Sequence, residues 1–220
     1  MSKFRCARCG TCCRKGGPGL HTDDADLVVH LGLTNIVCLR RGELAFDPQT
    51  NTVQPLLEEL LKIRGKGMGW ECIFFDADKG GCSVYAHRPL ECSVLQCDNT
   101  KEIFHALALP RLTRAHLVDA QSALGECIAE HERLFPMQDA VELARQKEHS
   151  AKIKLEDMVR QELFFRQAFA RRVQATDEQL WLYFGRPLEL VLLPLRSGSQ
   201  PYPFGCAQLR SGSSTPLGMI

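Results

Sequence analysis

Apolar residues in the C-terminal half of the chain recur every three to four positions, which is the spacing of amphipathic helices. The helices predicted from this spacing cover residues 113–134, 137–148, 152–173 and 177–184. Gly185 and Pro187 follow the last of them and are typical of a helix end. Residues 188–195 are β-prone, and the tail from Arg196, rich in Ser, Gly and Pro, is expected to be loosely held.

Shorter and less regular apolar segments occupy the N-terminal half. The predicted elements are a short helix through about Leu31, a hairpin over residues 43–55, a brief amphipathic helix over residues 56–63 and a second hairpin over residues 70–85. Thr22 or Asp23 suits the N-cap of the first helix. The second hairpin would bring Cys72 and Cys82 to a similar height, close enough to share a metal.

Eight of the eleven cysteines gather in two clusters. The first cluster is Cys6, Cys9, Cys12 and Cys13, and the second is Cys72, Cys82, Cys92 and Cys97. Four thiols within eight residues cannot all pair locally as disulfides, and neighbours such as Cys12 and Cys13 rarely bridge each other. Thiolates bind soft metals, and a turn can aim several sulfurs at one point. We therefore interpret all eight as metal ligands and expect the two clusters to meet in space.

Other candidate ligands have plainer explanations. Cys38 and Cys127 fall in apolar surroundings and are expected to be core residues, and Cys206 lies in the tail away from any partner motif. His87 could bind a metal, but eight cysteines are already available. A set of residues that resembles a hard-metal site is His21, Asp23, Asp24 and Asp26. Helix capping and the helix dipole account for these acids.

Charge and composition limit the partners. The chain has 27 basic and 26 acidic residues, a net charge of +1, so we expect no nucleic-acid partner and no anionic membrane partner. No apolar run approaches the roughly 18 residues that span a bilayer. Lys3 and Arg5 precede cysteines and charged residues, not an apolar segment, so we expect no secretory signal. The expected location is a reducing cytoplasm, where thiols persist.

Both clusters carry the motifs of a known family. The residues concerned are Cys6-x2-Cys9-Gly10-x-Cys12-Cys13, Trp70-x-Cys72, Cys82-x2-Tyr85-x2-Arg88-Pro89-x2-Cys92 and Cys97. Over about residues 4–98 the chain resembles the YkgJ-type cysteine-cluster family, described as a zinc- or iron-chelating domain with a CxxCxxCC signature. The resemblance implies that the same eight cysteines are the metal ligands. A related branch, the flagellin lysine N-methylases, implies iron–sulfur chemistry and methyl transfer.

Three functions are compatible with these residues. The first is a metal-binding protein with a redox, chelating or structural role, whose cofactor is an iron–sulfur cluster or zinc. Closed four-sulfur zinc sites are structural, whereas an iron–sulfur cluster suggests electron transfer, sensing or catalysis. The second is an iron–sulfur-dependent enzyme of the methyl-transfer type. The third is a metal-stabilised adaptor that binds a protein partner through the helical half. Thiolates suit both metals, so the sequence leaves the choice open.

These expectations combine into an α+β fold that is mostly helical. Residues 1–99 are predicted to form a small irregular cysteine-rich metal-binding module with a short β-hairpin. Residues 100–195 form a helical region packed on it, and residues 196–220 form the tail.

Overall fold

The computed structural model describes residues 6–97 and 99–197. Helices cover about half of these residues, and the strands form short antiparallel pairs, so the fold class is α+β. Cys206 and the tail beyond Ser197, for which predictions are given above, lie outside the described residues. Among the residues that are described, every helix is too short or too polar to span a bilayer.

The N-terminal half alternates short helical turns with three strand pairs. Its helical elements are α1 (Thr11–Lys15), η1 (Thr22–Leu27), α2 (Val28–Leu31), η2 (Leu33–Asn35), η3 (Tyr85–His87) and α3 (Leu90–Val94). Its strands are β1 (Ile36–Leu39), β2 (Leu44–Asp47), β3 (Thr52–Pro55), β4 (Leu60–Ile63), β5 (Phe75–Asp76) and β6 (Gly81–Cys82). The pairs are β1 with β4, β2 with β3 and β5 with β6. The β2–β3 pair confirms the hairpin predicted over residues 43–55.

The helix predicted over residues 56–63 is wrong. Its second half is strand β4, which pairs antiparallel with β1 and sets Leu61 opposite Cys38. Leu61 and Ile63 are buried while their neighbours are half-exposed, which is the alternation of a strand with one covered face. The long-range partner β1 therefore overrides the local apolar spacing, which fits a short helix equally well.

The second hairpin is shorter than predicted and differs in register. Strand β5 pairs with β6 so that Phe75, not Cys72, lies opposite Cys82. Cys72 instead forms an isolated bridge with Gly65. The carboxylate of Asp76 accepts hydrogen bonds from the backbone N–H groups of the next turn, which fixes the hairpin at residues 75–82.

Helices build the C-terminal half. They are α4 (Lys101–Leu107), η4 (Arg114–His116), α5 (Ala123–Leu134), α6 (Met137–Arg145), α7 (His149–Val173), α8 (Asp177–Phe184) and α9 (Leu188–Ser197). The helix predicted from residue 113 begins only at Ala123, because Ser122 caps it by accepting a hydrogen bond from Gly125 N–H at 3.0 Å. Residues 188–195 are helical, not extended. Leu188, Val191 and Leu192 are buried at helical spacing against α6 and α7.

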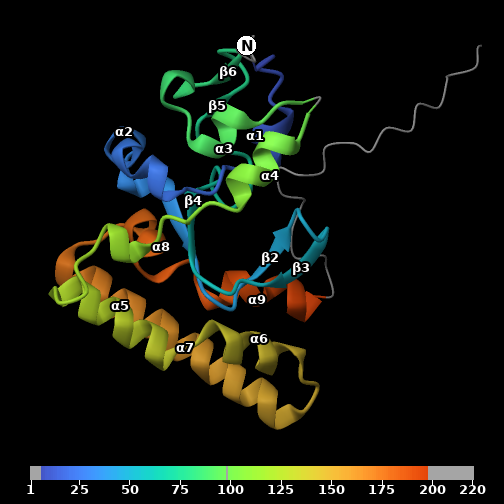
Figure 1. Cartoon of the computed structure of the whole chain (residues 1–220). Coiled ribbons are helices and arrows are strands. Elements are labelled where there is room, and N and C mark those ends of the chain that lie inside the picture. The colour runs from blue at the N-terminus through green and yellow to red at the C-terminus, as the bar shows by residue number, and fades with distance from the viewer. Residues whose placement is uncertain (1–5, 98, 198–220) are drawn as a thin grey trace, which may run out of the picture.

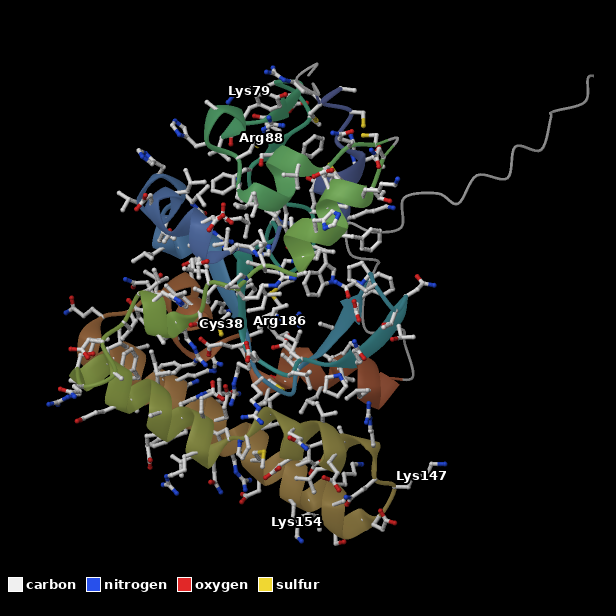
Figure 2. The ribbon with its side chains drawn as sticks, in the orientation of Figure 1. Cys38, Lys79, Arg88, Lys147, Lys154 and Arg186 are labelled. Atoms are coloured by element: carbon white, nitrogen blue, oxygen red, sulfur yellow. The ribbon has the colours of Figure 1, made fainter. Side chains whose placement is uncertain are left out.

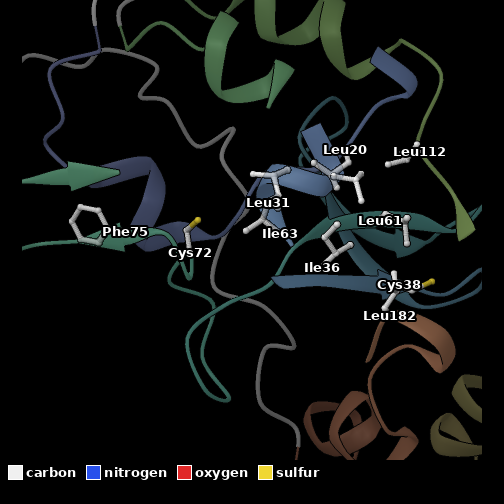
Figure 3. Close-up of a cluster of buried hydrophobic side chains, with 11 residues drawn as sticks. Leu20, Leu31, Ile36, Cys38, Leu61, Ile63, Cys72, Phe75, Leu112 and Leu182 are labelled. Atoms are coloured by element: carbon white, nitrogen blue, oxygen red, sulfur yellow. The ribbon is translucent and has the colours of Figure 1, made fainter. Parts of the chain in front are cut away.

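The two halves share their hydrophobic cores. Leu182 of α8 packs in the core built mainly from residues 20–112, and Leu44 of β2 packs among the C-terminal helices. Figure 3 shows the first core, with Phe75 and Cys72 at one end and Cys38 and Leu182 at the other. Cys38 is fully buried, which confirms it as a core residue.

The cysteine-rich elements lie together at one end of the molecule. In Figure 1, α1, α3, β5 and β6 form the upper end, and α5, α6 and α7 form the opposite end. The β2–β3 pair and strand β4 lie between them. Two segments more than 50 residues apart in the sequence, α1 and α3, are therefore neighbours in space.

Candidate metal centre

Seven of the eight predicted ligands line one cavity of about 480 Å³ at this end of the molecule. They are Cys6, Cys9, Cys12, Cys13, Cys82, Cys92 and Cys97. Helix α1 and the residues before it supply the first four, β6 supplies Cys82, and α3 with the turn after it supplies the last two. The fold thus brings the two cysteine clusters to the same cavity.

Gly10 allows the N-terminal cysteine run to pack tightly against the second cluster. Its φ angle of 76° lies in the left-handed region, and a Cβ atom there would lie 2.3 Å from Phe75 Cζ. The Gly10 carbonyl accepts the first α1 hydrogen bond, from Arg14 N–H at 2.9 Å. The Arg14 guanidinium in turn stacks on the Phe75 ring at 4.7 Å. Phe75 therefore serves as the platform for the Cys9–Cys13 turn.

Cys72 differs from the other seven. It does not line the cavity; its side chain is buried in the core next to Phe75. Its backbone N–H donates to the Cys13 carbonyl at 2.8 Å, so it is joined directly to the first cluster. Burial raises the pKa of the Cys72 thiol to about 11. Cys72 therefore lies behind the cavity wall, on the core side.

The Sγ atoms of Cys12 and Cys13 lie 4.0 Å apart. Two thiolates that share one tetrahedral zinc at about 2.3 Å lie about 3.8 Å apart, so this spacing suits a shared metal. Hydrogen bonding to Cys13, with help from the Lys15 charge, lowers the pKa of Cys12 to about 6, and the same bond raises that of Cys13.

Two of the cavity cysteines, Cys9 and Cys97, are exposed to solvent. The Cys9 Sγ lies 3.3 Å from Thr11 Oγ1, and hydrogen bonding to Thr11 lowers the pKa of Cys9. Burial raises the pKa of Cys82, which lies deeper. The cavity therefore combines accessible thiols at its mouth with more protected ones inside.

Cationic side chains accompany the thiols. Arg8 and Arg88 both stack on the Tyr85 ring, with guanidinium carbons 4.1 and 3.9 Å from the ring centroid. Both arginines, together with Lys15, line the cavity. Figure 2 shows Arg88 at the same end of the molecule as Lys79 of the β5–β6 turn. A site of several thiolates is anionic, and these cations offset part of that charge.

The donor set fits a thiophilic metal, although its geometry is not preformed. None of the cysteines within residues 6–97 and 99–197 forms a disulfide. In the same residues, no three Cys, His, Asp or Glu side chains are arranged to hold a metal ion. The sulfurs surround a common space without meeting at one point.

Several residues that the sequence analysis considered besides the eight cysteines lie outside the cavity. His87 is absent from the cavity lining and stacks on His30, with ring centroids 4.8 Å apart. Cys127 is half-buried on a groove between α5 and α7, so its assignment to the core is only partly right. Figure 2 places Cys38 in the middle of the molecule, away from the cysteine end.

Residues 5–108 match the family model described as "CxxCxxCC: Putative zinc- or iron-chelating domain". This part of the chain belongs to the CxxCxxCC family. No curated protein and no solved structure gave a significant match to the chain. The family match covers all eight predicted ligands of the CxxCxxCC domain and the whole cavity lining described above.

Sequence patterns did not identify two features of the CxxCxxCC domain. Tyr85 appeared only as part of the family motif, whereas in the structure it is the platform for Arg8 and Arg88 at the cavity. The Tyr85-x-x-Arg88 spacing across a turn is a usable signal for such stacking. The burial of Glu91, next to Cys92, could not be predicted, because a single glutamate in a polar stretch gives no sign of burial.

Proposed function

We propose that this protein binds zinc or iron, the latter as an ion or an iron–sulfur cluster, through the thiolates of the CxxCxxCC domain. The proposed ligands are Cys6, Cys9, Cys12, Cys13, Cys72, Cys82, Cys92 and Cys97. When bound, the metal supplies a cross-link between α1, β6 and α3, and in the iron case an electron-accepting centre.

One observation carries the proposal. Seven of these cysteines, drawn from two segments separated by more than 60 residues, line a single cavity. Cysteines that merely filled a core would be spread over the interior and covered by apolar neighbours. Cys38 behaves in that way, being fully buried, and it lies away from the cavity.

The position of Cys72 suggests how the eight thiols are divided. Its core location makes it the least accessible of the set. A metal bound near Cys13 would need Cys72 to turn toward the cavity, and its backbone bond to Cys13 keeps it within reach of such a rotation. We therefore assign Cys72 and Cys13 to the same metal centre.

A chelating or delivery role is favoured over a purely structural one. Structural zinc sites are closed by four ligands that solvent does not reach. Here Cys9 and Cys97 are exposed, so an incoming thiol or chelator could compete for the metal at the cavity mouth. Exchange of the metal through these two positions is the specific role that we propose.

Anaerobic purification followed by metal analysis and a visible spectrum tests the proposal. Bound iron with broad absorption near roughly 400 nm indicates an iron–sulfur centre, and colourless stoichiometric zinc indicates a zinc site. Rapid transfer of the metal to a competing chelator supports delivery, whereas slow transfer indicates a structural site. A protein that retains neither metal, even after anaerobic reconstitution, would contradict the proposal.

A further inference from the structure

We propose that a buried network centred on Glu91 positions α3, and with it the Cys92 thiol, for metal binding. Glu91 immediately precedes Cys92 on this five-residue helix. Isolated helices this short are not stable, so the orientation of α3 must come from contacts outside it. The inference rests on the proposed metal-binding function and extends it to residues that hold no metal themselves.

Within the described residues, the partners of the Glu91 carboxylate all come from outside α3. Its Oε2 accepts from Gly19 N–H at 2.9 Å, and its Oε1 accepts from Arg111 Nη1 at 2.7 Å. His21 Nε2 lies 3.3 Å from the same Oε1. Glu91 is 8% exposed and does not line the cavity, so its carboxylate is directed away from the cysteines. It is therefore an anchor for α3 and not a ligand.

A second carboxylate holds the first turn of α3. Asp24 is 2% exposed, and its Oδ1 accepts from Leu90 N–H at 2.8 Å, which satisfies a free donor at the start of the helix. Its Oδ2 accepts from His21 N–H at 2.9 Å. Asp24 thus caps two elements, because it belongs to the capping box of η1 with His21 and also caps α3 from across the fold.

The segment that carries these partners is itself rigid. Leu20 N–H donates to the Leu61 carbonyl of β4 at 2.8 Å, and Leu112 N–H donates to the Leu20 carbonyl at 2.9 Å. Gly19 has no room for a side chain, because a Cβ atom would lie 2.9 Å from Glu91 Oε1. The network therefore connects α3 to strand β4 through the backbone of Gly19 and Leu20.

The Glu91 carboxylate is buried beside a cation, because Arg111 Nη1 lies 2.7 Å from its Oε1. A buried carboxylate of this kind is costly to leave unpaired, so its partners hold a fixed geometry. Outer residues that fix ligand orientation in this way affect metal affinity by about 10- to 100-fold when they are changed.

The helical half contains a near copy of this network that serves as an internal control. Glu162 of α7 meets His131 Nε2 at 3.2 Å, binds Arg166 Nε and accepts from Leu188 N–H at 3.4 Å. Both histidines are fully buried, and within the described residues each has an Nδ1 atom without a hydrogen-bond partner. The two triads have the same chemistry, but only the Glu91 triad adjoins a cavity cysteine.

The test compares Glu91→Gln with Glu162→Gln in the full-length protein. Zn²⁺ affinity is measured under reducing conditions by competition with a chelator, the Co²⁺ absorption spectrum reports ligand geometry, and urea unfolding of the metal-free protein reports stability. Both variants should lose stability. Only Glu91→Gln should lower Zn²⁺ affinity by about 10-fold or more and change the Co²⁺ spectrum.

A milder pair guards against a Glu91 variant that does not fold. Arg111→Lys and Arg166→Lys keep the positive charge. Lysine cannot bind the glutamate and a backbone carbonyl at the same time in the geometry of the guanidinium group. Weakened metal binding in Arg111→Lys, with normal binding in Arg166→Lys, supports the positioning role. Wild-type Zn²⁺ affinity and a wild-type Co²⁺ spectrum in the Glu91 and Arg111 variants would overturn the positioning role. It would also be overturned if all four variants lost Zn²⁺ affinity in proportion to their loss of stability. A wild-type protein that binds no metal would overturn the proposed function as well.

Discussion

At the scale of single residues, the cavity depends on two very close approaches between the N-terminal run and the second cluster. Gly10 lies against Phe75, and the Cys72 N–H reaches the Cys13 carbonyl. The spacing of the cysteines predicted that they are metal ligands, because four thiols so close in sequence have few roles other than metal binding. It did not reveal that Cys72 points into the core, since side-chain direction depends on the pairing partner of each strand.

Gly10→Ala should destabilise the cysteine end of the molecule and weaken metal binding. The change combines backbone strain at a φ of 76° with a collision with the Phe75 ring. Gly80→Ala is the matched control, because Gly80 has a φ of 72° but open space around its Cβ position. We expect a loss of about 1 kcal/mol in the control and clearly more in Gly10→Ala, as measured by urea unfolding. Equal losses would contradict the packing role of Phe75.

Cys82→Ser should lower the amount of metal bound per chain, because Cys82 lines the cavity between the two clusters. Cys127→Ser is the control, since Cys127 is a half-buried cysteine on a separate groove. Metal analysis of the two variants purified side by side measures the difference. A full metal load in Cys82→Ser would remove Cys82 from the ligand set.

At the scale of elements, ion pairs link the strands to the helices. The Arg114 guanidinium binds the Glu59 carboxylate just before β4, the Glu132 carboxylate of α5 at 2.8 Å and the Tyr183 carbonyl of α8 at 2.6 Å. Arg40 reaches the same Glu132 from the end of β1 at 2.7 Å. This buried network fixes the helices against the strand pair that carries the first core.

Arg114→Met should lower the free energy of unfolding by about 3 kcal/mol, because it removes a buried guanidinium and leaves the half-buried Glu59 carboxylate without its cationic partner. The control is Arg133→Met. Arg133 pairs with Glu130 on the surface of α5 with its side chain 68% exposed, and such pairs contribute less than about 1 kcal/mol. Urea unfolding of both variants measures the difference. A loss in Arg114→Met no larger than in Arg133→Met would show that the network adds no stability.

The predictions were right for elements whose type is set by local apolar spacing. They were wrong for elements whose type is set by a partner distant in the sequence. The long helix α7 and the capped helix α8 follow from their apolar spacing and the Thr176 capping box. Strand β4 and helix α9 were each assigned the wrong type, because a short apolar run fits either conformation. The core against which each run packs then decides, and sequence spacing does not contain that information.

At the scale of the whole molecule, the shared cores join the cysteine end and the helical end into one structure. The division into residues 1–99, 100–195 and 196–220 stays a prediction. Leu182 and Leu44 nevertheless cross between the first two parts and enter the opposite core. Substitutions in the helical half should therefore change metal binding only by lowering the stability of the whole molecule. The Glu162 variant serves as a control for this reason.

Stability should fall as the pH drops from about 6.5 to about 4, because of His131. Burial lowers the pKa of His131 to about 4, helped by the nearby charges of Arg40 and Arg166 and opposed by Glu162. Between these values the unfolded chain binds a proton that the folded chain rejects, so the free energy of unfolding decreases by about 3 kcal/mol. Below pH 4 this contribution is already lost.

His131→Gln is the control for the pH experiment, since glutamine does not titrate. Urea unfolding of the wild type and the variant is compared at pH 7 and pH 5 in the same metal state, because thiolate–metal binding also depends on pH. The wild type should lose more stability than the variant over this interval. The same loss in both proteins would assign the pH dependence to other groups.

The sequence alone determined which atoms could bind a metal and which long segments would be helical. Thiol chemistry and helix periodicity are local properties, and both can be recognised without knowing the fold. Tertiary structure decided that the two cysteine clusters share one cavity, that Cys72 faces the core, and that Glu91 and Asp24 hold α3 from across the molecule. These features depend on contacts between residues far apart in the sequence, such as Gly19 and Glu91, which are 72 positions apart, and only the packing of the complete chain brings such residues together.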